Sequence, residues 1–121
     1  MTFSSEIYTF HSGKPQRPVS SSSVKFHSYD PATGNPLATV YTTTPAELEQ
    51  TISVAQTAFS QWSNTPASKR AEILLRAVSI LRERNNELAL TETLDTGKPY
   101  SETSTVDIIT GADVLEYYAH Q

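Results

Sequence analysis

One helix start is spelled out in four consecutive residues, and it divides the chain into two parts of different character. Thr44 offers a hydroxyl N-cap, Pro45 suits the first helical position, and Glu47 can return a hydrogen bond to the N-cap backbone. Before this start the sequence favours strands and turns, and after it apolar residues recur at helical spacing. The pattern predicts a small β-rich segment followed by a run of helices.

The segment before Thr44 predicts one antiparallel hairpin. Residues 24–29 alternate apolar and polar side chains, and residues 37–43 are rich in β-forming residues. Between them, Pro31 presets a turn and Asp30 can accept a hydrogen bond from the backbone two residues on. Gly34 tolerates a left-handed conformation, which completes a turn that reverses the chain.

Weaker signals precede the hairpin. Residues 7–10 predict a short strand, and the Gly and Pro in residues 11–15 predict a turn. Residues 18–23 have no periodicity and few apolar side chains, so we expect a mobile surface loop. The predicted organisation is a short strand and flexible Ser-rich loop over residues 1–23, then one domain portion over residues 24–121.

The first predicted helix carries one apolar stripe at steps of three and four residues. The stripe consists of Leu48, Ile52, Ala55, Phe59 and Trp62. Aromatic residues at this spacing belong to a core far more often than to a ligand platform. We therefore expect core packing for the stripe, including the Phe59 and Trp62 pair.

Further helices follow. Thr65 and Pro66 repeat the N-cap and proline device, and a second stripe runs to Arg84 through Ala71, Leu74, Leu75, Val78 and Leu81. Asn85 and Asn86 interrupt it. A shorter segment over residues 87–94 leads to Gly97, which suits a left-handed helix cap. After Pro99, residues 105–119 predict a last helix with a stripe of Ile108, Ala112, Leu115 and Ala119.

The composition narrows the function classes. The formal net charge is −4, and Lys and Arg never run beyond two in a row, which argues against a nucleic-acid partner. The absence of cysteine excludes a disulfide, a thiolate metal site and a Cys nucleophile within these residues. The sequence contains neither a secretory leader pattern nor an 18-residue apolar stretch, so we expect a cytoplasmic protein.

Several common site motifs are missing. His11, His27 and His120 fall on separate predicted elements, and we interpret them as surface or loop histidines rather than metal ligands. The four serines at 20–23 lack the glycine-flanked elbow of a serine nucleophile. The four glycines form neither a dinucleotide nor a phosphate-binding fingerprint.

Asp95 is the carboxylate whose position most needs a partner. It falls in the last turn of a predicted helix, where unsatisfied backbone carbonyls already carry partial negative charge. Lys98 could supply the neutralising cation. A bound metal ion with carboxylate and carbonyl ligands could do the same, since hard cations prefer oxygen. The residues alone leave both interpretations open.

Four segments together resemble the N-terminal part of the aldehyde dehydrogenase superfamily. They are Asp30-Pro31-Ala32-Thr33-Gly34, Phe59-x-x-Trp62, Arg70-x-x-Ile73-Leu74 and Glu92-Thr93-Leu94-Asp95-Thr96-Gly97-Lys98. Within the superfamily, residues 82–119 resemble bacterial betaine aldehyde dehydrogenase. The resemblance implies a partial α/β fold: a β-hairpin followed by three to four amphipathic helices, ending before the parallel dinucleotide-binding sheet.

The resemblance also implies a parent reaction, the NAD(P)+-dependent oxidation of betaine aldehyde to glycine betaine. In that family a catalytic Cys forms a thiohemiacetal and a Glu acts as general base. Both lie downstream of the matching segment, as do the nucleotide-binding residues. His120 and Gln121 depart from the Gly that usually follows here. We therefore expect an N-terminal fragment without activity of its own and without NAD(P)+ binding.

The family places a monovalent-cation site in this region. Carried over by motif, its ligands are Asp95 and the backbone oxygens of Ser28 and Tyr29, with K+ as the ion. The parent is expected to be a homo-oligomer, and the partner of this chain is expected to be the rest of the aldehyde dehydrogenase fold. An alternative is a non-catalytic fragment that associates with a full-length homologue or with itself, because apolar stripes on every helix need cover.

Overall fold

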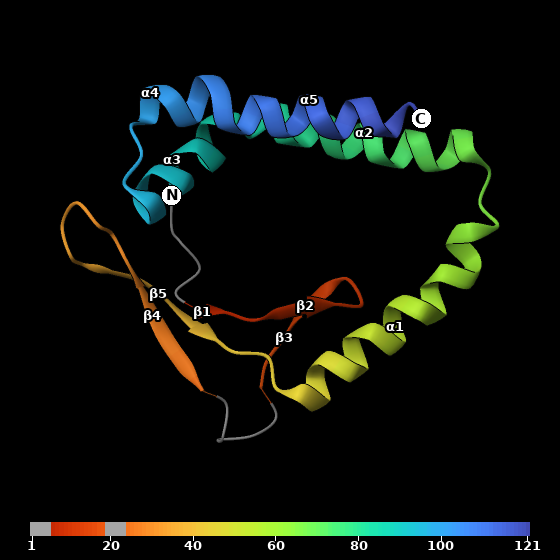
Figure 1. Cartoon of the computed structure of the whole chain (residues 1–121), viewed down its shortest axis with the longest axis horizontal. Coiled ribbons are helices and arrows are strands. Elements are labelled where there is room, and N and C mark those ends of the chain that lie inside the picture. Colours follow the sequence, from red (N-terminus) through yellow and green to blue (C-terminus); the bar gives the residue numbers. More distant parts are fainter. Residues whose placement is uncertain (1–5, 19–23) are drawn as a thin grey trace. The chain divides into compact units, whose positions relative to one another are not determined.

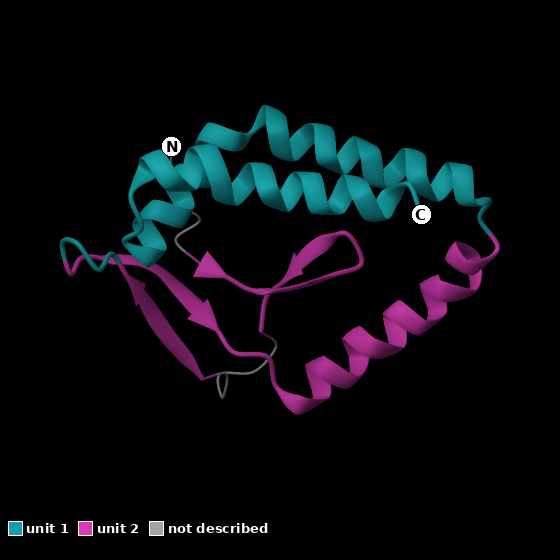
Figure 2. Cartoon of the chain, turned by 45° about the horizontal axis from the view of Figure 1, so that its top comes forward, with its two compact units in different colours: residues 1, 30–33, 65–121 teal, residues 2–29, 34–64 magenta. Residues whose placement is uncertain are grey.

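The computed structural model describes residues 6–18 and 24–121 (Figure 1). The chain forms two compact units, coloured differently in Figure 2. The N-terminal unit contains the described residues of 2–29 and 34–64. The C-terminal unit contains residues 30–33 and 65–121. The predicted boundary after residue 23 falls beside residues outside the described ranges, so it stays a prediction.

A three-stranded sheet, ordered β1-β5-β4, organises the N-terminal unit. Strands β4 (Lys25–Tyr29) and β5 (Pro36–Tyr41) pair antiparallel, which confirms the predicted hairpin. Strand β1 (Glu6–Ile7) adds parallel to β5. Ala38 of β5 is buried, whereas Val24 and Phe26 are exposed, so the sheet buries little among the described residues.

A second, smaller hairpin corrects the expectation for residues 7–15. Strands β2 (Thr9–His11) and β3 (Lys14–Gln16) pair antiparallel around Ser12 and Gly13, which both have positive φ. The predicted turn over residues 11–15 was therefore too long. Pro15 fits β3 because it pairs with Phe10, one step from the pair that closes the turn, where the ladder needs no N–H donor. Of the predicted loop over residues 18–23, residues 19–23 lie outside the described residues.

Helix α1 (Pro45–Ser63) begins where the four-residue signal predicts. The Thr44 N–H donates to Glu47 Oε2 at 2.7 Å, and the Glu47 N–H donates to Thr44 Oγ1 at 3.3 Å. This reciprocal pair confirms the capping box. Its hydrogen bonds satisfy two backbone donors that the helix itself leaves unpaired.

The apolar stripe of α1 is exposed, and the prediction that it packs into a core was wrong for this chain. The exposed fractions are 52% for Leu48, 44% for Ile52, 64% for Phe59 and 38% for Trp62, and α1 buries no residue. Periodicity shows which face of a helix is apolar. It does not show whether another element covers that face.

Helices α2 (Ala67–Glu83) and α5 (Ile108–Ala119) lie side by side in the C-terminal unit (Figures 1 and 2). Val78 of α2 is 1% exposed, and Ala112 and Ala119 of α5 are also buried. Alanines let two helices approach closely. Arg82 of α2 joins the pair at its surface by donating to Asp113 at 2.7 Å and to Glu116 at 2.6 Å.

The boundaries of α2 and α3 differ slightly from the predicted ones. Pro66 precedes α2 without a side-chain cap, and the Thr65 carbonyl instead accepts a hydrogen bond from Arg70 at 2.6 Å. The structure places Pro66 rather than Thr65 at the N-cap position, so the predicted start of α2 was one residue too early. Helix α2 ends one residue earlier than predicted, and α3 (Asn85–Thr96) begins at the first asparagine. Asparagine is tolerated at a helix start. The backbone N–H groups of the first turn have no intrahelical partners, so a side chain that competes for backbone hydrogen bonds disrupts none there.

The last helix starts earlier than residue 105. Short helix α4 (Tyr100–Glu102) begins directly after Pro99 and continues through a π-helical segment, η1 (Thr103–Asp107), into α5. Residues 100–104 were thus wrongly left out of the predicted helix, because their polar side chains carry no apolar stripe. Among the described residues, no helix has both the length and the apolar character needed to cross a membrane. The predicted partial α/β architecture, a hairpin followed by helices, is confirmed.

Candidate functional site

The three residues of the predicted cation site lie in both units. Ser28 and Tyr29 end strand β4 of the N-terminal unit, and Asp95 lies in the last turn of α3 in the C-terminal unit. Each part can be described within its own unit, and the joint site stays a prediction.

The end of β4 is irregular at the two residues whose carbonyls were predicted as ligands. The register shifts between Ser28, which pairs with Ala38, and Tyr29, which pairs with Pro36. Such a bulge interrupts the hydrogen-bond ladder. Pro36 has no N–H to donate to the Tyr29 carbonyl. The carbonyls of Ser28 and Tyr29 are oxygen donors, which is the ligand type that a hard cation prefers.

The turn after β4 is held by Asp30, as predicted. Its carboxylate accepts from the Ala32 N–H and from the Thr33 hydroxyl, both at 2.8 Å, and the residue is only 8% exposed. The Ala32 N–H, followed by the Thr33 hydroxyl, lowers the pKa of Asp30 from its ordinary value. These bonds favour the charged carboxylate and fix the shape of the turn.

Gly97 forms the corner after Asp95 and contacts this turn. Its φ is +76°, which confirms the predicted left-handed cap of α3. A Cβ built on Gly97 would lie 2.8 Å from Cγ of Pro31, within the same unit. The corner therefore needs glycine for two reasons: its backbone conformation and the contact with the proline ring.

Lys98 has a partner other than the one that the sequence suggested. Its ammonium donates to both carboxylate oxygens of Asp107 at 2.7 Å. This bond raises the pKa of Lys98, and the pair ties the corner to the π-helical segment. Lys98 is thus engaged with Asp107, and the two interpretations left open for Asp95 both stay predictions.

A buried hydroxyl cluster behind the corner was not predicted. Thr103 is 0% exposed, and its Oγ1 lies 3.0 Å from the Ala89 carbonyl and 2.9 Å from the Thr93 hydroxyl. Asn85 adds a hydrogen bond from Nδ2 to the Ser104 carbonyl at 2.8 Å. The cluster joins α3 to η1. No sequence signal distinguishes these threonines from the many exposed ones.

The corner after α3 positions side chains at the end of that helix. Over residues 6–18 and 24–121, no three His, Cys, Asp or Glu side chains converge as metal ligands. His11 lies in β2, His27 in β4 and His120 after α5. The corner built by Asp30, Gly97 and Lys98 can hold Asp95 at the end of a rigid helix, where its carboxylate is exposed.

Known proteins resemble this chain both in sequence and in structure. A family model described as "Aldehyde dehydrogenase family" matches residues 19–121. The NAD+ complex of an aldehyde dehydrogenase from Bacillus cereus is similar, with 28% identity and a TM-score of 0.89 over 98% of this chain. The aldehyde dehydrogenase KauB from Pseudomonas aeruginosa is similar, with 34% identity and a TM-score of 0.87 over 94% of this chain.

An indole-3-acetaldehyde dehydrogenase in its apo form is a third similar structure, at 32% identity and a TM-score of 0.86 over 94% of this chain. The present chain spans about a quarter of the length of these structures: 24% of the Bacillus cereus chain, 23% of KauB and 27% of the third. The matching portion includes both the hairpin and the helices.

Proposed function

Since this chain belongs to the aldehyde dehydrogenase family, we propose that it forms the N-terminal part of an NAD(P)+-dependent enzyme that oxidises betaine aldehyde to glycine betaine. The observation that carries the family role is the match over residues 19–121. The resemblance of residues 82–119 to bacterial betaine aldehyde dehydrogenase supports the substrate. In this role the helices pack against the nucleotide-binding part of the enzyme, and this chain alone has no activity.

The proposed lack of separate activity follows from the chemistry. Thiolate catalysis needs a cysteine, and these 121 residues contain none. Bound NAD(P)+ would accept the hydride of the aldehyde in the complete enzyme. The purified chain should therefore form no NADH from betaine aldehyde and NAD+. Turnover above the blank would contradict this part of the proposal.

Chimeras test the family role and the substrate separately. Residues 24–121 would replace the matching portion of a betaine aldehyde dehydrogenase and, in a second chimera, of KauB. We expect the first chimera to keep more of its parent's NADH formation, because residues 82–119 fit that subgroup. Equal retention would remove the betaine aldehyde assignment, and two folded but inactive chimeras would count against the structural role.

The cation prediction is part of the same proposal. Asp95 and the carbonyls of Ser28 and Tyr29 supply oxygen ligands of the kind that K+ prefers, and the strand irregularity at Ser28 and Tyr29 supports the fit. In the active chimera, Asp95→Ala should abolish the rise in melting temperature that K+ produces over choline at equal ionic strength. An unchanged K+ response would argue against Asp95 as a ligand.

The uncovered stripe of α1 favours a second candidate function, a non-catalytic fragment that binds a full-length homologue. Leu48, Ile52 and Phe59 are 44–64% exposed. About three quarters of the similar Bacillus cereus chain lies outside the portion that this chain matches. We propose the remainder of an aldehyde dehydrogenase as the occupant of this face. Light scattering of the mixture tests it. A stable complex that Phe59→Asp abolishes would support binding, whereas two separate species would exclude it.

A further inference from the structure

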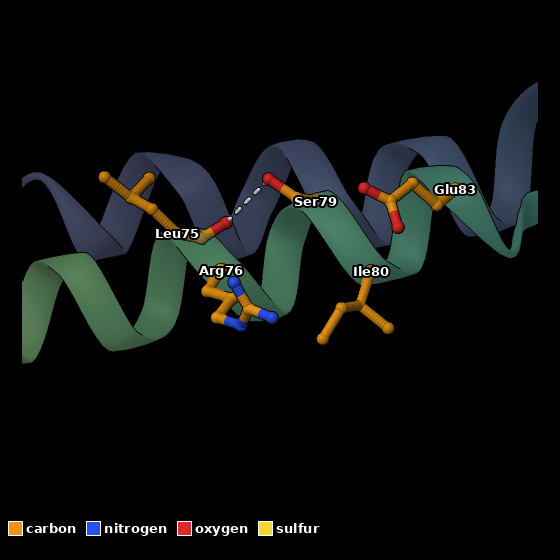
Figure 3. A pocket seen from close by; sticks show the side chains of 5 residues that line it. All are labelled: Leu75, Arg76, Ser79, Ile80 and Glu83. Carbon is orange, nitrogen blue, oxygen red and sulfur yellow. Dashed lines mark hydrogen bonds between the residues drawn. The ribbon is translucent and has the colours of Figure 1, made fainter.

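One face of helix α2 packs against α5, and a different face of the same helix is exposed. A shallow pocket of about 380 Å³ runs along it, lined by Leu75, Arg76, Ser79, Ile80 and Glu83 (Figure 3). The small Ser79 lies in its middle and donates to the Leu75 carbonyl at 3.2 Å. This groove takes no part in the corner around Gly97 or in the proposed cation site.

Two charges on this face stand out because they make no ion pair within the described residues. Elsewhere on the helices, Lys69 pairs with Glu72, Arg82 with Asp113 and Glu116, Arg84 with Glu87, and Lys98 with Asp107. Arg76 and Glu83 are both exposed, and they lie seven residues apart on one helix. Seven residues are about two helical turns, or about 10 Å along the axis, so the two charges project from one side.

A parallel row of apolar side chains accompanies the charges. Ile73 is 55% exposed and Ile80 is 42% exposed, and these two are also seven residues apart. A seven-residue spacing of apolar residues beside charged ones is the pattern by which two helices associate. The charges are of opposite sign at the two ends of the groove, so the face is complementary to itself when two copies run antiparallel.

We propose that this face of α2 is a dimerisation surface that binds α2 of a second copy of the chain in antiparallel orientation. Arg76 of each copy pairs with Glu83 of the other, and the two-fold axis passes beside Ser79. Ile80 of both copies meets beside the axis and forms the apolar centre of the seam, and Ile73 of each copy lies at one of its two ends. The charges argue for this occupant, because a two-fold interface places each charge of a copy opposite the other charge of its mate. The proposal is independent of the proposed oxidoreductase role.

A charge-swap experiment tests this arrangement directly. In Glu83→Arg two like charges face each other twice, and in Arg76→Glu the same holds with negative charges, so each variant alone should bind itself at least about tenfold more weakly than the parent chain. Mixed in equal amounts, the two variants regain opposite charges at both positions and should associate again. Sedimentation equilibrium over a wide concentration range measures all four samples, with circular dichroism as a check on folding.

The matched control is Glu49→Arg, which makes the same change of net charge on exposed α1. It should leave self-association unchanged. A parent chain that stays monomeric at every concentration would overturn the proposal. So would a Glu83→Arg variant that associates as well as the control, or a mixture that fails to recover. Association through another apolar face would appear as binding insensitive to both charges, which also rejects this surface.

The register has its own test because the chain contains no cysteine. A single Ser79→Cys should form an intermolecular disulfide under mild oxidation, since the symmetry axis brings the two sulfur atoms together. Gln56→Cys on α1 is the control for random collision. Equal rates of cross-linking in the two variants would reject the antiparallel register.

Discussion

Helices α1 and α2 have similar apolar stripes, yet only one of them contributes to a core. Val78 of α2 is 1% exposed because α5 lies beside it, whereas Phe59 and Ile52 of α1 are 64% and 44% exposed. The capping of α1 is the better of the two, since α2 starts without a side-chain cap. A well-formed helix is therefore not by itself a packed one. Packing depends on a partner surface, which local sequence does not specify.

The largest expected difference between the two units concerns their glycine turns. Gly34 and Gly97 both have positive φ, but only the Gly97 position meets Pro31 at 2.8 Å when a Cβ is added. Gly34→Ala should cost about 1 kcal/mol for the backbone conformation alone. Gly97→Ala should cost about 3 kcal/mol because overpacking is added. Urea unfolding measures both, and equal costs would show that the Pro31 contact does not constrain the corner.

Side-chain truncation gives the next largest effect. Val78→Ala should lower the free energy of unfolding by about 2 kcal/mol, since it removes two buried methyl groups. Ile52→Ala on α1 should change it by no more than about 0.5 kcal/mol. Val114→Ala on α5 is the control of matched chemistry, because Val114 is 50% exposed. A large loss at Ile52 would indicate that the α1 stripe is covered in solution.

The buried hydroxyl cluster should give a smaller effect. Thr103→Val keeps the side-chain shape but leaves the Ala89 carbonyl and the Thr93 hydroxyl short of a partner, at a cost of about 1.5 kcal/mol. The control is Thr105→Val, because Thr105 is exposed and its hydroxyl donates to the Ser101 carbonyl of its own helix. Thermal unfolding compares the two variants. If both melt alike, the cluster does not hold α3 to η1.

The smallest expected effect concerns the loss of stability at low pH, which should be similar in the two units. Asp30 and Glu47 both accept hydrogen bonds from neighbouring residues, which lower their pKa values from the ordinary 3.8 and 4.5. A lowered pKa stabilises the folded state above the unfolded pKa, and this stabilisation is lost as the pH falls through the folded value. Asp30→Asn and Glu47→Gln should each flatten the decline in stability below about pH 5. A variant that declines as steeply as the parent would show that its carboxylate contributes no acid sensitivity.

The sequence by itself determined the features that depend on neighbouring residues. The capping box at Thr44 and Glu47, the turn held by Asp30 and the left-handed cap at Gly97 follow from hydrogen bonds and backbone sterics within a few residues. The segments that resemble aldehyde dehydrogenases could also be recognised from the sequence, because each motif consists of residues close together in the chain. The hairpin and the number of helices came from periodicity.

Only the tertiary structure decided which of these elements meet. Lys98 pairs with Asp107, Thr103 reaches Thr93, and Pro31 rests on Gly97, across separations in sequence that no local rule relates. The same holds for the two stripes, because burial of Val78 depends on α5, more than 25 residues further along the chain. Contacts of this kind gain their free energy from surfaces removed from water, and the sequence shows those surfaces without showing what covers them.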